Sequence, residues 1–419
     1  MNGGPSARFE HPSVEPVKTV TSEALKSTPL AAAHAALGAR LTPFAGYAMP
    51  VQYPAGILKE HLWTRAHAGL FDVSHMGPAF LELTAPTGDG EADHRAVAAA
   101  VEPLVCGDVR GLKPGQFRYT LLLNAAGGVL DDLMIGRPAG PDQQGRLYLV
   151  VNAGTKEADF AAIATAGGGA ARLSRADDGA LIAVQGPEAV AVVEPLIPGV
   201  AGLGFMTFAE FPFEGHVLTV SRSGYTGEDG YEILAPAALA EGLWARLMAD
   251  DRVAAVGLGA RDSLRLEAGL PLYGHDADET TSPVEAALTF ALSRRRLKAR
   301  DFPGAARIAA ELADGPARVR VGLKVLQGAP AREGAAITDP EGTAIGVVTS
   351  GGFSPSLGGP IAMGYVPPAS AAPGTALCVV VRGRSQAAVV AELPFTRHRY
   401  FRKPKPAQEV ADHAFHQGS

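Results

Sequence analysis

The chain has 419 residues, of which 47% are hydrophobic and 19% are charged, and its formal net charge at pH 7 is -6. This composition is typical of a globular protein with two or three domains, and the absence of a basic stripe argues against a nucleic-acid partner. Two cysteines exclude a disulfide scaffold, and no apolar run approaches the roughly 20 residues of a membrane-spanning helix.

The beginning of the chain shows little periodicity. Residues 1–27 are rich in Pro, Ser and Gly and lack the pattern of a targeting peptide, so we expect a flexible leader and a cytoplasmic location. A helix is expected over residues 30–37 and another over residues 57–68, with Leu58 and Leu62 pointing inward.

Two carboxylates lie inside an apolar run that follows a glycine turn. Residues 118–123 and 129–135 flank this turn and predict a β-hairpin. Successive side chains of a strand point to opposite faces, so Asp131 and Asp132 face different surroundings. A buried carboxylate is costly unless it is paired or hydrogen-bonded. Two interpretations stay open: a solvated carboxylate beside a turn, or a carboxylate that faces a polar pocket.

Strands and helices alternate through the first 290 residues. A strand over residues 147–152 ends at Asn152, and a polar, Gly-rich loop over residues 221–233 separates two further strands. A helix over residues 236–248 follows. The pattern predicts an α+β fold in which helices pack on mixed sheets.

Arginines mark two helix ends in this part. Arg261 opens a short helix, where a guanidinium suits bidentate carboxylate recognition, although an internal salt bridge fits equally well. Residues 282–285 read as a capping box that starts a helix to about residue 292. The arginines at residues 294–296 then lie near its end, as a solvated helix end or as a docking surface for an acidic partner.

The sequence pattern changes after about residue 299. Apolar and polar residues alternate over residues 319–325, and further short strands are separated by Gly- and Pro-rich turns, which predicts a small antiparallel barrel or sandwich. The expected division is a leader (1–27), a domain of two α+β subdomains (28–299), a β-barrel domain (300–405) and a loose tail (406–419).

Common catalytic motifs are missing from the sequence. There is no phosphate-binding GxxxxGK[ST], no HExxH and no GxSxG. From the residues alone, the carboxylate hairpin, the Gly-rich loop and Arg261 suit a small, flat, partly anionic ligand without identifying it.

Several motifs resemble those of the aminomethyltransferase (T-protein) family of the glycine cleavage system, in order and without a large gap from about residue 28 to residue 402. This resemblance implies three parts around a central folate cavity, the last part being a small β-barrel. The motifs that carry it are residues 71–76, 127–133, 224–230, 260–269, 280–285, 301–304 and 349–367.

The resemblance also implies a reaction and its partners. A lipoylated H-protein would carry an aminomethyl group on its lipoyl arm. The chain would transfer the methylene of this group to tetrahydrofolate, giving 5,10-methylenetetrahydrofolate, ammonia and the dihydrolipoyl H-protein. Tetrahydrofolate is then the co-substrate, and no metal is implied.

Site residues follow from the matching motif positions. Asp132 matches the family's key carboxylate, which we expect to hydrogen-bond the pterin and to favour positive charge that develops during transfer. Glu232 matches a residue that grips the pterin edge, Arg261 a folate-binding arginine and Tyr400 a tyrosine near the cavity. The remaining candidates for the cavity wall are Asn152, Tyr225 and Met76.

Three alternatives share the architecture. The folate-linked half of sarcosine or dimethylglycine dehydrogenases would need an N-terminal flavin-binding half, which this chain lacks. A folate-dependent demethylase would act on a small methylated donor, and the motifs around Asp132 argue against it. A non-catalytic folate-binding protein of iron–sulfur assembly would carry Lys-Gly-Cys where this chain reads Ser223-Gly224-Tyr225.

Overall fold

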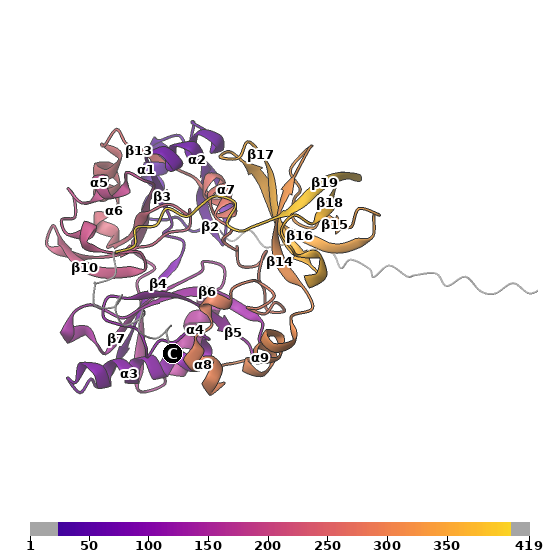
Figure 1. Cartoon of the computed structure of the whole chain (residues 1–419). Coiled ribbons are helices and arrows are strands. Elements are labelled where there is room, and N and C mark those ends of the chain that lie inside the picture. Colours follow the sequence, from indigo (N-terminus) through magenta and orange to yellow (C-terminus); the bar gives the residue numbers. More distant parts are fainter. Residues whose placement is uncertain (1–23, 404–419) are drawn as a thin grey trace, which may run out of the picture.

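The computed structural model describes residues 24–403 (Figure 1). The expected leader lies mostly outside these residues, and the expected tail lies wholly outside them. Within them, pairing begins slightly before the expected start at residue 28, because the backbone N–H of Lys26 donates to the carbonyl of Gly46 at 2.9 Å. A two-stranded hairpin, β1 (Arg40–Phe44) and β2 (Tyr47–Gln52), follows the first helix.

A five-stranded antiparallel sheet forms the first layer, in the order β5-β6-β7-β4-β8. Two helices, α3 and α4, pack on one face of it and bury an apolar core that includes Val97, Leu149 and Ile163. The predicted hairpin is confirmed as β5 and β6. The bounds are β4 (Gly77–Leu83), α3 (Gly90–Val101), β5 (Phe117–Leu123), β6 (Val129–Gly136), β7 (Arg146–Val151), α4 (Lys156–Gly167) and β8 (Ala171–Arg175).

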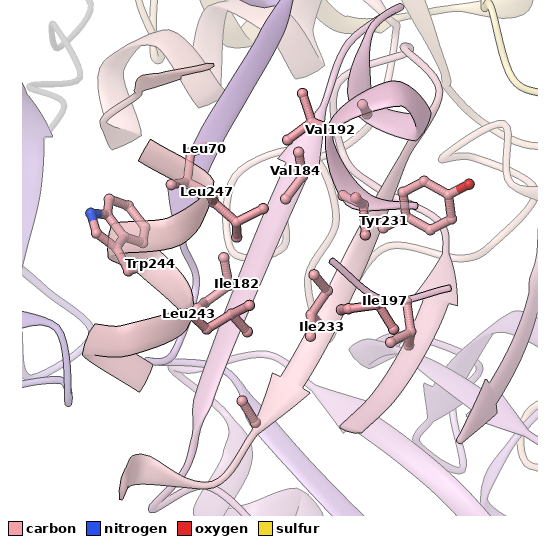
Figure 2. Packing of buried hydrophobic residues seen from close by; sticks show 14 of the residues in the cluster. Leu70, Ile182, Val184, Val192, Ile197, Tyr231, Ile233, Leu243, Trp244 and Leu247 are labelled. Atoms are coloured by element: carbon pink, nitrogen blue, oxygen red, sulfur yellow. The ribbon is translucent and has the colours of Figure 1, made fainter. Parts of the chain in front are cut away.

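A six-stranded mixed sheet forms the second layer, in the order β10-β11-β12-β9-β3-β13. Figure 2 shows Leu243 and Leu247 of helix α6 packed against Ile182 and Val184 of β9 on its outer face. The bounds are α1 (Ala31–Ala36), β3 (Ala68–Asp72), β9 (Ala180–Gln185), α5 (Ala189–Val193), β10 (Thr207–Phe213), β11 (His216–Arg222), β12 (Gly230–Ala235), α6 (Ala237–Met248) and β13 (Val253–Ala255).

The inner faces of the two sheets share one apolar core. Phe117 of β5 and Tyr148 of β7 stack with ring centroids 5.5 Å apart, and Phe208 of β10 packs against both rings. Helix α7 (Leu258–Glu267) adds Ala260 and Leu264 to this core. The layers therefore run helix, sheet, sheet, helix, and loops from both sheets meet near α7.

The C-terminal part is a closed six-stranded antiparallel barrel, as predicted. In β14, Val321, Leu323 and Val325 fill its interior, in agreement with the alternation of the sequence. Helices α8 (Arg294–Ala299) and α9 (Ala305–Asp314) precede it. The strands are β14 (Val319–Val325), β15 (Ala336–Thr338), β16 (Ala344–Ser354), β17 (Gly359–Val366), β18 (Ala376–Val381) and β19 (Arg384–Ala391).

After the barrel, the chain returns to α7 and the second layer as an extended segment, residues 393–403, which we call the C-terminal strap. Figure 1 shows it in yellow, running from the barrel across α7. The backbone N–H of Thr396 donates to the carbonyl of Glu267 at 3.0 Å, and that of Arg399 donates to the carbonyl of Gly227 at 2.8 Å. The strap thereby joins the barrel to α7 and to the loop that follows β11 of the second layer.

The inward face predicted for the second helix is wrong. In α2 (Ile57–Ala66), Leu58 and Leu62 are 52% and 44% exposed, whereas the buried face carries Glu60, His61 and Thr64. This face is polar because it packs on α7, where Nε2 of His61 contacts Oε2 of Glu267 at 3.1 Å. Hydrogen bonding to a partner helix, rather than apolar burial, decided the orientation.

The helix predicted after residue 282 is also wrong, although its capping box forms. The hydroxyl of Ser282 accepts from the N–H of Glu285, and the Glu285 carboxylate accepts from the N–H of Ser282. A left-handed Ala287, with φ 55°, then interrupts the chain, and only a short 3-10 turn follows. The Glu285 carboxylate instead pairs with Arg307 and Arg318.

The arginine run 294–296 is not a uniformly solvated helix end. Arg296 is 1% exposed, and its guanidinium pairs with Glu102 at 3.0 Å, while Arg295 pairs with Glu102 and Asp108. Of the three, only Arg294 is exposed, and it opens α8 rather than closing an earlier helix. Across residues 24–403, no helix has both the length and the apolar surface that a bilayer crossing requires.

Candidate functional site

The two aspartates of β6 lie away from bulk water. Asp131 is fully buried and pairs in register with Leu122, while Asp132 is half-buried and pairs with Leu121. The interpretation of a solvated carboxylate beside the turn is therefore excluded for Asp131. Because Asp132 keeps partial exposure, it is the one of the two that a ligand can reach.

Asn152, the residue directly after β7, connects both carboxylates. Its backbone N–H donates to Oδ2 of Asp131 at 3.0 Å. Its side-chain Nδ2 donates to Oδ1 of Asp131 and to Oδ1 of Asp132, both at 2.9 Å. One amide group therefore fixes the position of Asp132 relative to its neighbour, and we call this arrangement the Asn152 clamp.

Burial and mutual repulsion control the protonation of these carboxylates. Burial, with the negative charge of Asp131 as the next cause, raises the pKa of Asp132 to about 7. Burial also raises the pKa of Asp131. Neither aspartate forms an ion pair with a cation of the described part of the chain. At neutral pH, Asp132 is thus poised between its two protonation states.

Arg261 lies on α7 above the ring of Tyr225, with its guanidinium 5.0 Å from the ring centroid. Burial lowers the pKa of Arg261, and the negative charge of Glu232 opposes this shift. Within residues 24–403, Nη1 of Arg261 is buried without a hydrogen-bond partner, and the side chain makes no salt bridge there. The internal salt bridge is therefore not formed with the described residues, and the ligand-binding role of Arg261 stays a prediction.

Glu232 and Tyr225 come from the second sheet and the loop beside it. The Glu232 carboxylate accepts a hydrogen bond from the hydroxyl of Ser223 at 3.0 Å and remains partly exposed. The hydroxyl of Tyr225 donates to the carbonyl of Pro271. The negative charge of Asp132 helps to raise the pKa of Tyr225, after burial as the main cause. Both sheets thus contribute polar groups to one neighbourhood.

Three residues of this neighbourhood were not predicted as site residues. The hydroxyl of Tyr119 is buried close to the Asp132 carboxylate, which is the next cause after burial that raises its pKa, and its ring stacks on that of Phe290 with centroids 5.5 Å apart. Phe290 is 68% exposed, which is unusual for an aromatic ring. Asp159 of α4 faces Asp131. The exposure of Phe290 and the facing of Asp159 depend on tertiary contacts, so no local pattern could identify them.

Met76 and Tyr400 have different surroundings. Met76 packs against the core between the two sheets, beside Ala260 of α7. Tyr400 lies in the C-terminal strap and stacks on Phe205 with centroids 3.9 Å apart and an interplanar angle of 7°. The ring contacts of Tyr400 among the described residues are with Phe205 and His398, so its role at the site stays a prediction.

Two surface hollows lie elsewhere and have volumes of about 510 and 550 Å³. Neither is lined by a predicted site residue. The arginines of the first, Arg146 and Arg175, are already paired with carboxylates, and the second is lined by Lys26 and by Asp177, which is paired with Lys156 and Arg175. The polar neighbourhood of Asp132 has the less satisfied groups, so we regard it as the functional site. In the part of the chain that the structure describes, no group of three His, Cys, Asp or Glu side chains is arranged to hold a metal.

Comparison with known proteins gives two family matches. The GCVT N-terminal domain matches residues 30–296, and the glycine cleavage T-protein C-terminal barrel domain matches residues 318–396. Together these models span the two sheets, the site and the barrel.

Relatives match over nearly the whole chain. The mitochondrial aminomethyltransferase of Gallus gallus is 46% identical, over 90% of this chain and 94% of its own length. The aminomethyltransferase of Synechococcus elongatus is 41% identical, over 92% and 99%. The crystal structure of glycine cleavage system aminomethyltransferase T from Bartonella henselae superimposes with a TM-score of 0.83 at 44% identity, covering 90% of this chain and all of that one. This chain therefore belongs to the glycine cleavage T-protein family.

Proposed function

We propose that this chain is an aminomethyltransferase of the glycine cleavage system. The reaction moves the methylene of an aminomethyl group from the sulfur of a lipoyl arm to tetrahydrofolate. The carbon–sulfur and carbon–nitrogen bonds of the aminomethyl group break, and two bonds from the methylene to folate nitrogens form. The two folate N–H groups lose their hydrogens as protons; the amine takes up one proton and leaves as ammonia, and the sulfur gains one and becomes a thiol. The products are 5,10-methylenetetrahydrofolate, ammonia and dihydrolipoyl H-protein.

The observation that carries this proposal is the half-buried Asp132 held by the Asn152 clamp. A carboxylate in partly apolar surroundings stabilises a neighbouring positive charge more strongly than one in water. A pKa of about 7 also lets Asp132 exchange a proton with a nitrogen group at neutral pH. Both properties suit a reaction in which positive charge develops on a one-carbon unit between nitrogen atoms.

Tetrahydrofolate fits the remaining groups as a co-substrate. Nη1 of Arg261 is a buried donor without a hydrogen-bond partner in the described part of the chain, and it suits a carbonyl or carboxylate oxygen. The carboxylate of Glu232 is an acceptor for ring N–H groups. The planar rings of Tyr225 and Phe290 would lie near a flat ligand. Most of the rate enhancement would then come from holding the two reactants together.

A lipoylated H-protein is the proposed donor, and we propose that residues 28–299 form the folate-binding aminomethyltransferase domain and residues 300–405 the β-barrel domain. Arg294 is the exposed cation of its run and follows the exposed ring of Phe290 closely in the chain. It suits contact with an acidic partner. The relatives include proteins named mitochondrial as well as a cyanobacterial one, so the cytoplasmic location stays a prediction.

The test is the release of ammonia from aminomethyl-loaded H-protein, with and without tetrahydrofolate, by the wild type and by Asp132→Asn. We expect folate-dependent release by the wild type and its collapse in the variant, with folate binding retained in equilibrium dialysis. No release by the wild type would contradict the proposal and leave the demethylase, which should instead consume a methylated amine. Full activity of the variant would remove Asp132 from the mechanism.

A further inference from the structure

A second carboxyl group stands behind the Asn152 clamp and has no part in the proposal above. Asp159 lies in the first turn of α4 and is 3% exposed. Its carboxyl group faces that of Asp131, within hydrogen-bonding reach. Its Oδ2 is buried without a hydrogen-bond partner in the described part of the chain. Two ionised carboxylates have no hydrogen to share, so this contact is favourable only when one of them holds a proton.

Within the described residues, no nearby cation neutralises the two carboxyl groups, so one of them must hold a proton. Lys156, which precedes Asp159 on the same helix, directs its ammonium to the hydroxyl of Tyr47 at 2.8 Å and to Asp177 at 3.2 Å. Within the described residues, the groups close to Asp159 are Asp131 and Asp132 of β6, the hydroxyl of Thr155, whose hydrogen bond lowers the pKa of Asp159, and Tyr273. Burial raises the pKa of Tyr273 to about 12, so this ring is neutral at physiological pH.

The hydrogen bonds indicate which carboxyl group holds the proton. Both oxygens of Asp131 already accept from Asn152, one from its backbone N–H and one from its side-chain amide. These donors stabilise the ionised form of Asp131. Within the described residues, no amide donates to the Asp159 carboxyl group, and the single hydroxyl of Thr155 stabilises its ionised form less than burial and Asp131 destabilise it. In agreement, burial and the charge of Asp131 raise the pKa of Asp159 to about 8.

We propose that Asp159 is a positioning residue that stays protonated at neutral pH and donates its hydroxyl hydrogen to Asp131. Asp131, held ionised between Asp159 and Asn152, then fixes the amide that donates to Asp132. The chain of contacts runs from Asp159 through Asp131 and Asn152 to Asp132. Asp159 touches no substrate and acts on the reacting group only through the Asn152 clamp.

The presence of a proton on Asp159 can be tested without measuring the reaction. Infrared difference spectra at pH 7 resolve the carbonyl stretch of a protonated carboxylic acid from the amide and carboxylate bands. Because Asp132 also titrates near this pH, the comparison uses Asp132→Asn with and without Asp159→Asn. We expect the Asp159 substitution to remove one protonated-carboxyl band. An unchanged spectrum would overturn the proposal, whatever reaction the protein catalyses.

The positioning role rests on the proposed function and is tested by two variants of similar size. Asp159→Asn keeps a donor toward Asp131 and should keep kcat for ammonia release within about threefold of wild type. Asp159→Leu has no donor and should lower kcat about 10- to 100-fold, as expected for a misplaced reacting group. Equal loss in both variants, or no loss in Asp159→Leu with its circular dichroism unchanged, would contradict the role.

The pH dependence separates positioning from a general structural effect. In the wild type, Asp159 loses its proton above about pH 8, and the second negative charge should loosen the clamp and lower kcat. Asn at this position has no proton to lose, so the decline near pH 8 should be absent from Asp159→Asn. The same decline in both proteins would contradict the role. An inactive wild type would contradict the proposed function instead, and the infrared result would still decide the state of Asp159.

Discussion

Two groups of buried carboxylates in this protein have opposite surroundings. At the site, the Asn152 amide donates to Asp131 and to the half-buried Asp132, Asp159 faces Asp131, and burial raises the pKa of each carboxyl group. At the junction of α7 with the barrel, Glu267 and Asp276 are equally buried, but their pKa values are lowered. The pKa values shift in opposite directions because the two groups of carboxylates have different hydrogen-bond donors and cations around them.

The junction carboxylates are fully paired. Glu267 accepts from the guanidinium of Arg65 at 2.9 Å, from the hydroxyl of Ser354 at 2.6 Å and from His61. Asp276 pairs with Arg265 at 2.8 Å and also accepts from barrel hydroxyl groups. These contacts join the barrel to the layered part. The junction carboxylates are paired with cations and join the parts of the fold, whereas the site carboxylates have no cation partner among the described residues, which is typical of groups with shifted pKa values at functional sites.

The substitution Asp132→Asn tests the difference between the two carboxylate groups most directly. We expect the rate of ammonia release to fall about 10³-fold, because a preorganised charge at the reacting centre is lost. The midpoint of thermal unfolding should stay unchanged or rise, since a repelling buried charge is removed. Differential scanning calorimetry beside the kinetic assay checks this. A large fall in the unfolding temperature would place Asp132 with the structural carboxylates.

The converse change is Glu267→Gln at the junction. The substitution removes a buried charge and leaves Arg65 and His61 incompletely paired, so unfolding free energy should fall by about 3 kcal/mol. Urea denaturation measures it. Folded Glu267→Gln should keep nearly normal turnover at low temperature. Loss of turnover without loss of stability would contradict the division between the two groups.

A pH series should separate the two groups in one protein. Below about pH 7, Asp132 becomes protonated, and kcat/KM should fall about tenfold per pH unit. Glu267 has its pKa lowered from 4.5 to about 2, so its contribution to stability is complete above pH 4.5 and is lost only as pH falls toward 2. Asp159 has a raised pKa and therefore stabilises the fold more as pH falls from about 8. Activity should thus disappear between pH 7 and 5 while the unfolding temperature stays level or rises.

The smallest expected effect concerns partner binding at the surface. Arg294→Glu should raise KM for aminomethyl-loaded H-protein about threefold at low salt, with the difference fading as salt increases. Arg172→Glu on β8 makes the same charge change at another exposed position and serves as the control. Equal effects of both variants would indicate net charge rather than a docking surface.

Much of the fold could be predicted because it follows local periodicity. The alternation of Val321, Leu323 and Val325 predicted a barrel strand, and the glycine turn predicted the hairpin that carries Asp132. The prediction that Leu58 and Leu62 point inward was wrong because α2 buries its polar face against α7. The capping box of Ser282 and Glu285 forms without a following helix. The Glu285 carboxylate also pairs with two arginines that are distant in the sequence, a contact that no local pattern predicts.

The site could be predicted less completely. One polar neighbourhood contains five residues that the resemblance implied: Asp132, Asn152, Tyr225, Glu232 and Arg261. Their roles stay predictions. The importance of Asp159 depends on the packing of α4 behind β6. An acidic residue in the first turn of a helix is common for capping and dipole reasons alone, so its position in the sequence carries no such signal.

The C-terminal strap has a consequence for how the molecule is made. Arg399 of the strap pairs with the buried Glu228 at 2.5 Å, and Phe401 accepts from the N–H of Phe205. The ribosome synthesises these residues after every element that they touch. The Gly-rich loop beside Tyr225 therefore acquires its last ion pair only when synthesis has passed the barrel. We expect nascent chains that stop at residue 392 to be cleaved by protease within residues 223–230, and full-length chains to resist cleavage there.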